Sequence, residues 1–567
     1  MAYSIENPWI KERETIMDAW KPDYNRGYFN NMNVNLTCDF FSMSRAMMRK
    51  YAKMIKSFGY TGMQMTDGCA HWVRFGSYEP DHDKKIDMCE ALHAEGLKAS
   101  LWVWAASFTG HGYSDPTVKY VAKDGGSAYD DPEVFATFNK YYDIYAELAP
   151  YYDRLILHFF DPGQLRNIDD IIKFASLLEK KFKDKNPNIE ICVDTWGSPD
   201  DFPENLVKAG KTDWMLMELP FLPSWGAPGR RENFRKGVKA LGSKLGVWSW
   251  YTCDIEIDQN ARWVVNPKVI KYIYNKVREQ GDHVMIPEYW SEMDSYHVLN
   301  LFSLYCGGQM LINPDRDTDE LLMEIAHKIY GEKYGDRVFR VLKFVEDIRS
   351  GETWDNYWWP GAFKPGVVVD FHEIQPRAHE ALETLQAIVA EKELTTDQPI
   401  PVTPIELAKL MIAHVDQLTQ YVDFRIEMER LEKLAADGAS KETLSAEIDK
   451  VWKPIPDYNV IVGVWGQPEF RVQYHMVWEF CKNNGIEIPK RGLVWYTLKK
   501  RYYEYMVADC KAYETDTLGH GFYEGAYPFS FIHDEILEDM QKDGLITILD
   551  DKDKHVRLND FEAYKYR

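Results

Sequence analysis

Hydrophobic and polar positions follow two alternating periods along residues 31–314. Short apolar runs with a period of two, typical of β-strands, are each followed by a longer stretch with a helical period. The expected strands cover residues 33–39, 61–67, 98–104, 154–161, 189–196, 214–219, 244–251 and 283–290. The expected helices cover residues 44–58, 83–95, 132–149, 169–182, 203–209, 232–241, 267–279 and 296–305. Residues 1–30 show no clear period and are interpreted as a lead-in.

Alternating strands and helices predict an α/β fold with a parallel sheet, and eight such units predict a closed (β/α)8 TIM barrel. An open, doubly wound sheet is the structural alternative. No glycine-rich dinucleotide fingerprint follows the first expected strand, so the barrel is favoured.

After Pro314 the pattern becomes mainly helical. Helical periodicity covers residues 318–350, 375–394 and 404–436, and an aromatic-rich loop covers residues 351–369. Beyond residue 450 the pattern is mixed, with strand-like runs at 459–465 and 544–549 and helix-like runs at 472–484 and 493–511. We therefore expect three parts: a barrel with its lead-in (1–314), a helical domain (315–450) and a mixed α/β region (451–567).

The fourth expected strand supplies the first candidate site residue. Leu155, Leu157, Phe159 and Asp161 share one face by the period of two. We interpret this face as the inward one, with Asp161 as its last position. The alternative is that Asp161 caps the next helix or starts the Pro-Gly turn that follows it.

Acidic residues recur at the ends of the expected strands, which all point to one face of a barrel. These acids are Asp39, Asp67, Asp161, Asp194, Glu218 and Glu288. Aromatic and further polar side chains beside them are His71, Trp72, Arg74, Trp104, His158, Trp196, Trp248, Trp250, Tyr289 and Trp290. Converging carboxylates repel one another, which is how a site obtains a proton donor beside a charged base.

Glycoside hydrolases catalyse their reaction with paired acids among aromatic side chains. One carboxyl group protonates the leaving oxygen, and the other either attacks the anomeric carbon or activates a water molecule. We expect Asp161 to act with Glu218 or Glu288 across the barrel mouth, and the other residues just named to bind substrate. Packing is the alternative for the tryptophans. Trp102 and Trp104 share a face and could fill the space between barrel and helices, and Trp214 is expected in the core.

Composition and charge narrow the classes of partner and the cellular locations that are expected. The 567-residue chain has a formal net charge of -22, which argues against nucleic acid or an anionic membrane as a partner. No apolar run is long enough for a membrane span, and no signal-peptide pattern opens the chain, so a cytoplasmic location is expected. The expected partner is a small carbohydrate, with a homo-oligomer left open.

The eight cysteines form no CxxC pair and are interpreted as buried, reduced thiols. There is no GxSxG, P-loop or HExxH motif to support serine hydrolysis, ATP use or zincin chemistry. Neither a cofactor nor a metal ion is expected.

Three segments resemble the junction between the catalytic barrel and the C-terminal helical domain in a group of bacterial glycoside hydrolases. They are residues 295–302, 311–322 and 329–331. That group includes α-glucuronidase-like and hexosaminidase-like barrel enzymes. The resemblance covers roughly residues 30–350 and implies an acid on strand four, matched by Asp161. In two respects the sequence differs: Pro162 stands where hexosaminidase-type barrels carry a second acid, and no β domain precedes the first expected strand.

Three functions fit these patterns. The first is a glycosidase, exo-acting on short or imported glycosides. The second is a sugar isomerase or epimerase that holds a divalent cation on Glu218, Asp194, His158 and Glu288; His158 lies on the opposite face of its strand from Asp161, which weakens this set. The third is a sugar-binding protein without catalysis, which would not need so many acids.

Overall fold

The structure is a computed structural model of the chain. It describes residues 3–17, 43–66, 82–106, 122, 125–159, 165, 167–195, 198–218, 236–237, 245–247, 263, 265–280, 289–291, 298–348, 369–453, 468–487, 495, 499–500, 502–503, 506–507, 510, 515–518, 533–550 and 555–559. Within these ranges the expected alternation of strands and helices is present.

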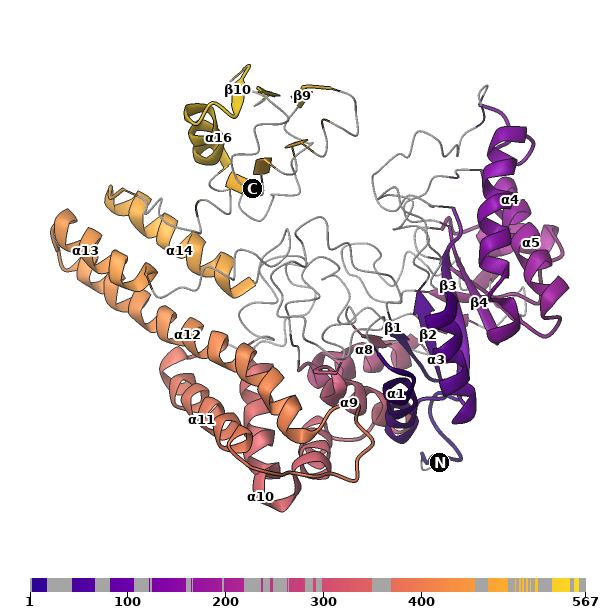
Figure 1. Cartoon of the computed structure of the whole chain (residues 1–567), viewed down its shortest axis with the longest axis horizontal. Coiled ribbons are helices and arrows are strands. Elements are labelled where there is room, and N and C mark those ends of the chain that lie inside the picture. Colours follow the sequence, from indigo (N-terminus) through magenta and orange to yellow (C-terminus); the bar gives the residue numbers. More distant parts are fainter. Residues whose placement is uncertain are drawn as a thin grey trace.

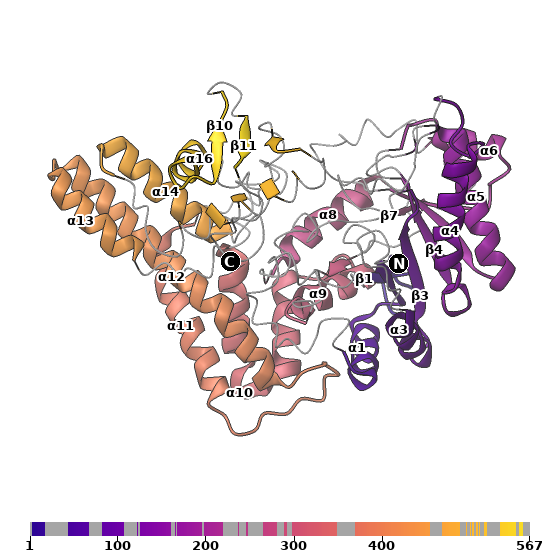
Figure 2. The same cartoon turned by 45° about the horizontal axis from the view of Figure 1, so that its top comes forward.

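Eight parallel strands form one curled sheet (Figure 2). They are β1 (Glu14–Met17), β2 (Gly62–Thr66), β3 (Lys98–Trp104), β4 (Arg154–His158), β5 (Glu190–Asp194), β6 (Met215–Glu218), β7 (Leu245–Val247) and β8 (Tyr289–Ser291). Their order is β7-β6-β5-β4-β3-β2-β1-β8. Sequential parallel strands with the eighth beside the first are the arrangement of a (β/α)8 barrel. The described residues include no pairing between β7 and β8, where the barrel closes.

The first barrel strand is not the one expected from the sequence. β1 pairs with β2 on one side and with β8 on the other, so Glu14–Met17 occupies the first position. This strand lies in the stretch interpreted as a lead-in. Its first two residues, Glu14 and Thr15, are polar yet buried, which hid the strand from a search for apolar runs. The expected strand at 33–39 lies outside the described residues.

Helices cover the outside of the sheet (Figure 1). They are α1 (Arg45–Phe58), α3 (His82–Ala94), α4 (Pro132–Ala146), the short 3-10 helix η2 (Ala149–Tyr151), α5 (Ile168–Lys185), α6 (Phe202–Lys208), α8 (Pro267–Gln280) and α9 (Leu301–Ile312). The Ser44 side chain caps the start of α1, and Gly59 ends it with a φ of 102°. The helix expected at 296–305 is instead α9, which begins at Leu301 and continues to Ile312.

The two faces of β4 are assigned the other way round from the sequence interpretation. Leu155 and Leu157 belong to the hydrophobic cluster that includes residues of the surrounding helices, so they face outward. Arg154 and His158 instead make their contacts with side chains of other strands inside the barrel. Leu155 and Leu157 of β4 therefore face the helices. The argument that placed Asp161 on the inward face is wrong, and Asp161 itself lies outside the described residues.

The C-terminal part is mainly helical, as expected. Its elements are α10 (Thr318–Ile348), α11 (Phe371–Val389), α12 (Pro404–Ala436), α13 (Lys441–Trp452), α14 (Pro468–Asn484), α16 (His533–Lys542) and an antiparallel sheet of β9 (Thr517–Leu518), β10 (Ile546–Ile548) and β11 (Val556–Leu558). Pro404–Ala436 matches the expected range, and a capping box of Thr403 and Glu406 begins that helix. α13, α16, β9 and β11 were not expected.

The acidic segment between α9 and α10 stabilises the start of α10 and contacts α8. Asp317 accepts hydrogen bonds from the backbone N–H groups of Asp319 and Glu320 at 2.9 and 3.1 Å, which caps α10. Arg316 bonds Glu324 at 2.8 Å, and Arg278 of α8 bonds Asp315 at 2.9 Å. The residues that carry the family resemblance therefore fix the junction between barrel and helices.

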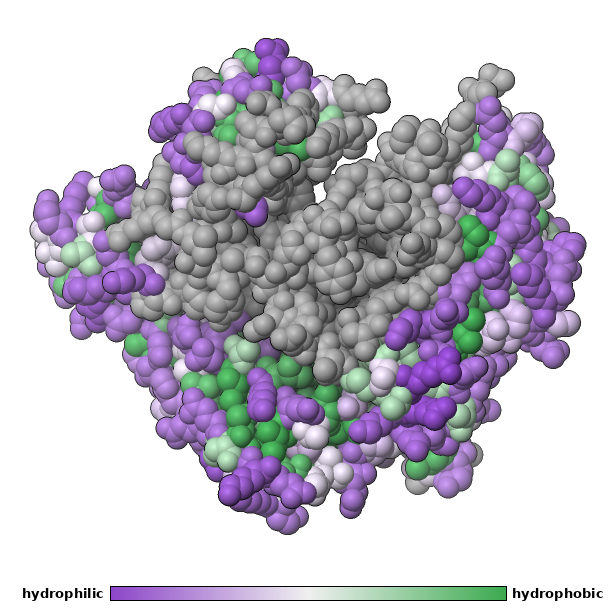
Figure 3. Space-filling model, viewed as in Figure 1, coloured by the Kyte–Doolittle hydropathy of each residue, from purple (hydrophilic) through white to green (hydrophobic). Residues whose placement is uncertain are grey.

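Two hydrophobic cores run through the described residues. The first extends from Ile10 to Val422 and joins the barrel to α10, α11 and most of α12. The second begins at Phe424 of α12 and includes residues up to Leu558. α12 thus contributes to both cores, and the division at 315 and 450 stays a prediction. In the view of Figure 3, hydrophilic residues dominate the outer surfaces of α13 and of α4 and α5. Among the described residues, no helix combines the length and apolarity that a membrane span needs.

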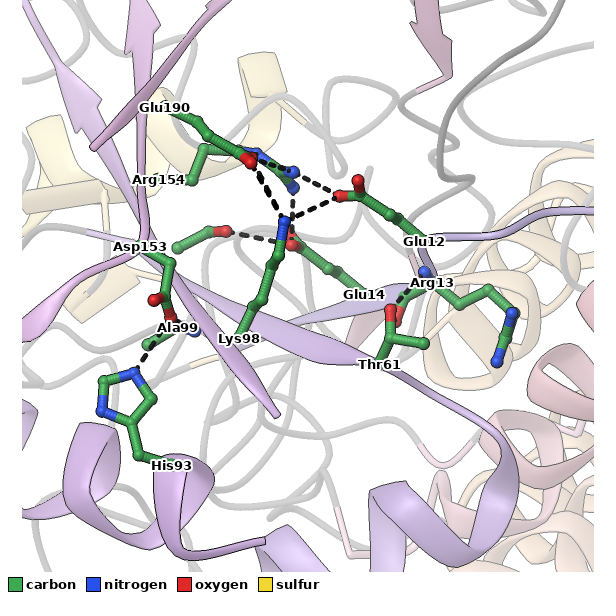
Figure 4. Close-up of polar contacts among 11 residues, drawn as sticks. Glu12, Arg13, Glu14, Thr61, His93, Lys98, Ala99, Asp153, Arg154 and Glu190 are labelled. Atoms are coloured by element: carbon green, nitrogen blue, oxygen red, sulfur yellow. Dashed lines mark hydrogen bonds and ion pairs between the residues drawn. The ribbon is translucent and has the colours of Figure 1, made fainter. Parts of the chain in front are cut away.

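An ionic network around a buried cation joins four strands at the N-terminal end of the barrel (Figure 4). Arg154 donates to Glu14 of β1 at 2.6 Å, to Glu190 of β5 at 2.6 Å and also to Glu12. Lys98 of β3 bonds Glu190 at 3.1 Å. Burial lowers the pKa of Arg154, but the surrounding carboxylates raise it by more, so the net effect is a raised pKa. Burial raises the pKa of Glu14 more than the nearby Arg154 lowers it. The three carboxylates are therefore needed to hold one buried guanidinium.

We predict that Arg154→Met destabilises the barrel by about 3–5 kcal/mol, because it leaves the fully buried Glu14 without its cation. Glu14→Gln should cost about 1–2 kcal/mol, since Arg154 keeps Glu12 and Glu190. Lys98→Met, at the half-exposed edge, should cost under about 1 kcal/mol. Urea unfolding followed by tryptophan fluorescence measures all three. Equal losses for the three variants would show that Arg154 is not the centre of the network.

Candidate active site

Four neighbouring strands end on residues that the sequence analysis had selected. Trp104 is the last residue of β3, His158 of β4, Asp194 of β5 and Glu218 of β6. Pairing places Trp104 beside His158, and His158 beside Asp194. Glu218 follows Met217, the partner of Asp194. Because the C-terminal ends of the strands share one rim of a barrel, the backbone positions of these four residues follow a continuous arc of it.

A carboxylate holds the imidazole at the centre of this arc. Nδ1 of His158 and Oδ2 of Asp194 are 2.7 Å apart, and Asp194 is fully buried. The indole Nε1 of Trp102 donates to the same oxygen at 3.4 Å. The second nitrogen of His158, Nε2, takes no part in this bond. A carboxylate on one nitrogen fixes the orientation and tautomer of the ring.

Two tryptophans surround the imidazole. The ring centroids of Trp102 and His158 are 4.7 Å apart, and those of Trp104 and His158 are 4.8 Å apart. The two indoles meet edge to face at 4.9 Å. Both tryptophans therefore lie inside the barrel, and the alternative that they fill the space between strands and helices is wrong for them. Surrounded by apolar rings, the His158–Asp194 pair experiences a stronger electrostatic interaction than it would in water.

The end of β5 is fixed by one further bond. The Thr195 hydroxyl donates to the carbonyl oxygen of Met217 at 2.6 Å, and its backbone N–H donates to the same carbonyl at 2.9 Å. This ties the residue after Asp194 to the residue before Glu218. The two strand ends that carry acids are thus held at a constant separation.

The sequence analysis missed Trp102 as a member of the site, although it named Trp104 two positions later. Their shared face was the available signal, but the direction of that face was not known. Trp214 is buried in the core as expected, and its indole donates to Glu179 at 3.1 Å.

The other expected site residues are placed only in part. The backbone of Glu218 closes β6, and Tyr289 and Trp290 lie within β8. Those outside the described residues are Asp39, Asp67, His71, Trp72, Arg74, Asp161, Trp196, Trp248, Trp250 and Glu288.

The described cysteines do not supply a nucleophile. The side chains of these described cysteines are buried thiols outside any disulfide, as expected: Cys89, Cys192, Cys306, Cys481 and Cys510. Burial raises the pKa of Cys481 to about 11, and it raises the pKa of the Cys89 and Cys306 thiols further. They stay protonated at neutral pH. Within the described ranges, no three His, Cys, Asp or Glu side chains are grouped so as to hold a metal ion.

No protein-family model matches the chain, and no curated protein matches it. Similar solved structures include a family 89 glycoside hydrolase from Clostridium perfringens in complex with PUGNAc, at 11% identity and a TM-score of 0.45 over 87% of this chain and 59% of that one. The catalytic domain of a β-amylase from Paenibacillus polymyxa is 9% identical, with a TM-score of 0.34 over 54% of this chain and 99% of that one. An endo-β-1,4-mannanase from Thermotoga petrophila is 11% identical, with a TM-score of 0.32 over 55% and 79%. At these values the likenesses assign no family and no activity to this chain.

We predict that His158→Leu destabilises the barrel by about 2–3 kcal/mol, because the buried Asp194 loses its 2.7 Å hydrogen bond with His158. His158→Asn should recover about half of that loss, since the Asn amide can donate near the position of Nδ1. Denaturant unfolding of the two variants beside the wild type measures the difference. An equal loss in both would mean that packing of the ring, and not the bond to Asp194, determines its effect.

Proposed function

We propose that the chain is a glycoside hydrolase that acts from the ends of short or imported glycosides. The observation that carries this proposal is the arc of Trp104, His158, Asp194 and Glu218 at adjacent strand ends of a (β/α)8 barrel. Barrel enzymes place their chemistry at this rim. Carboxylates beside indole rings suit a sugar, because the rings offer flat apolar faces and the carboxylates accept hydrogen bonds from hydroxyls.

The catalytic step needs two carboxyl groups on opposite sides of the glycosidic bond. One donates its proton to the leaving oxygen while that oxygen's bond to the anomeric carbon breaks; the other attacks that carbon or removes a proton from water. We assign this pair to Asp161 with Glu218 or Glu288. Glu218 is favoured as the partner, because it ends β6 close to the Asp194 position of β5.

Asp194 and His158 have a different role in this proposal. Oδ2 of Asp194 already accepts bonds from His158 and Trp102, so it positions the imidazole. In this proposal His158 and Trp104 border the sugar subsite. The remaining residues selected from the sequence complete the sugar subsite in this proposal. They are Asp39, Asp67, His71, Trp72, Arg74, Trp196, Trp248, Trp250, Tyr289 and Trp290.

We predict that Asp161→Asn and Glu218→Gln each lower kcat on a cleaved aryl glycoside by at least about 10²-fold, as does Glu288→Gln if that acid is the partner. A panel of aryl glycosides identifies the substrate first. Glu190→Gln is the matched control, because Glu190 begins β5 at the opposite end from Asp194. It should retain wild-type kcat. Full activity in all three acid variants would refute the assignment of the pair.

The alternative is a metal-dependent sugar isomerase or epimerase. One observation favours it: a histidine whose Nδ1 is held by a carboxylate is also the arrangement that orients a metal-binding Nε2.

We predict that turnover of glycosides survives dialysis against EDTA, since the proposed hydrolysis needs only carboxyl groups. The assay compares treated and untreated protein, with and without added Mg²⁺ or Mn²⁺. Loss on chelation that either ion restores would support the isomerase and contradict the hydrolase.

A further inference from the structure

Trp102 contacts both members of the His158–Asp194 pair. Its indole Nε1 donates to Oδ2 of Asp194 at 3.4 Å, and its ring centroid lies 4.7 Å from that of His158, with the two ring planes at 35°. At 3.4 Å the hydrogen bond is long, so it directs the carboxylate more than it binds it. Neither the proposed catalytic acids nor the sugar subsite includes Trp102, so these contacts need a separate explanation.

The strand register shows why a tryptophan suits this place. Trp102 pairs with Ile156 of β4, whereas His158 and Asp194 pair with each other one layer nearer the C-terminal rim. Asp194 also lies two strands away from Trp102, which is roughly 10 Å between the backbones. The indole therefore passes beneath the imidazole to reach the carboxylate. Tryptophan combines this reach with a nitrogen that only donates.

Two donors converge on one oxygen of Asp194. Because the indole nitrogen cannot accept, Oδ2 must act as an acceptor toward it. An oxygen that accepts from both Trp102 and His158 has no place for a proton of its own. Nδ1 of His158 must then carry the proton of the 2.7 Å bond. Trp102 thus selects the protonated nitrogen through the carboxylate, while its ring limits rotation of the imidazole from below.

We propose that Trp102 is a positioning residue that fixes the orientation of His158 and places a proton on its Nδ1. It acts through Asp194, which it directs toward that nitrogen, and through the face of its own ring. Because Trp102 lies one layer deeper than His158 and Trp104, it acts on the sugar subsite through them. The consequence for turnover rests on the proposed glycosidase activity, and the consequence for His158 does not.

The chain offers a matched pair of variants, Trp102→Phe and Trp214→Phe. Both tryptophans are 1% exposed, and both donate an indole N–H to a carboxylate, that of Trp214 to Glu179 at 3.1 Å. Trp214 precedes β6 and packs in the hydrophobic core between strands and helices. Each change keeps an aromatic ring and removes one N–H donor, but only Trp102→Phe removes it from Asp194.

Nuclear magnetic resonance of the His158 ring tests the proposal without any activity assay. In the wild type and in Trp214→Phe, we expect a sharp Nδ1–H signal with a nuclear Overhauser effect to the Trp102 indole proton, because both protons lie against Oδ2. In Trp102→Phe the Nδ1–H signal should broaden and move upfield. Absence of the Overhauser effect in the wild type would overturn the proposal even if Trp102→Phe does not fold. An unchanged Nδ1–H signal in folded Trp102→Phe would overturn it as well.

Kinetics on a cleaved aryl glycoside form the second arm. Trp102→Phe should raise KM about five- to tenfold and leave kcat within about twofold, because the reacting acids keep their positions and only the border of the subsite is disturbed. Trp214→Phe should keep both constants. An unchanged KM in Trp102→Phe would contradict the positioning role. If no glycoside is cleaved, the proposed function fails, and the spectra alone decide the role of Trp102.

Discussion

The interior of the barrel depends on how one buried guanidinium is paired. Arg154 begins β4 and bonds carboxylates of β1, of β5 and of the segment that precedes β1. A cation removed from water costs several kcal/mol unless carboxylates surround it closely. Those carboxylates lie on other strands, so the Arg154 side chain must point into the barrel. Since side chains alternate along a strand, this requirement also sets the direction of Ile156 and His158.

The contacts at the two ends of β4 therefore depend on each other. The register that sets Arg154 beside Glu190 also sets His158 beside Asp194, at the other end of the same strand pair. A slip of one residue would turn every side chain of β4 to the opposite face, which would expose Leu155 and Leu157 to the charged interior. The ionic network at the N-terminal end and the imidazole–carboxylate pair at the C-terminal end therefore depend on one register. Sequence and packing agree here: charged or polar residues occupy both ends of the inward face, and apolar residues occupy the outward face.

These relations explain what the sequence could and could not predict. Hydrophobic periodicity and the signals at element ends were sufficient to predict α1, α12 and β3, because each has a long regular pattern with recognisable ends. They failed for β1, where buried Glu14 and Thr15 are stabilised by partners distant in sequence. They also gave the wrong inward face of β4, since alternation separates two faces without saying which one meets the helices. Trp104, His158 and Asp194 lie together at the strand ends, as their positions in the sequence suggested, but the bond that joins two of them required the register. Their part in a functional site stays a prediction.

The division of roles within the site follows from the same geometry. An acid that gives its proton to a glycosidic oxygen must present a carboxyl oxygen to the substrate. Oδ2 of Asp194 instead receives hydrogen bonds from the protein, from His158 and Trp102. Proton transfer is therefore better assigned to another strand-end acid, and Glu218 is the nearest along the rim. Most of the acids named here therefore have supporting roles: Glu12, Glu14 and Glu190 hold the buried cation, and Asp194 orients an imidazole. Only the pair proposed above is assigned to the reaction itself.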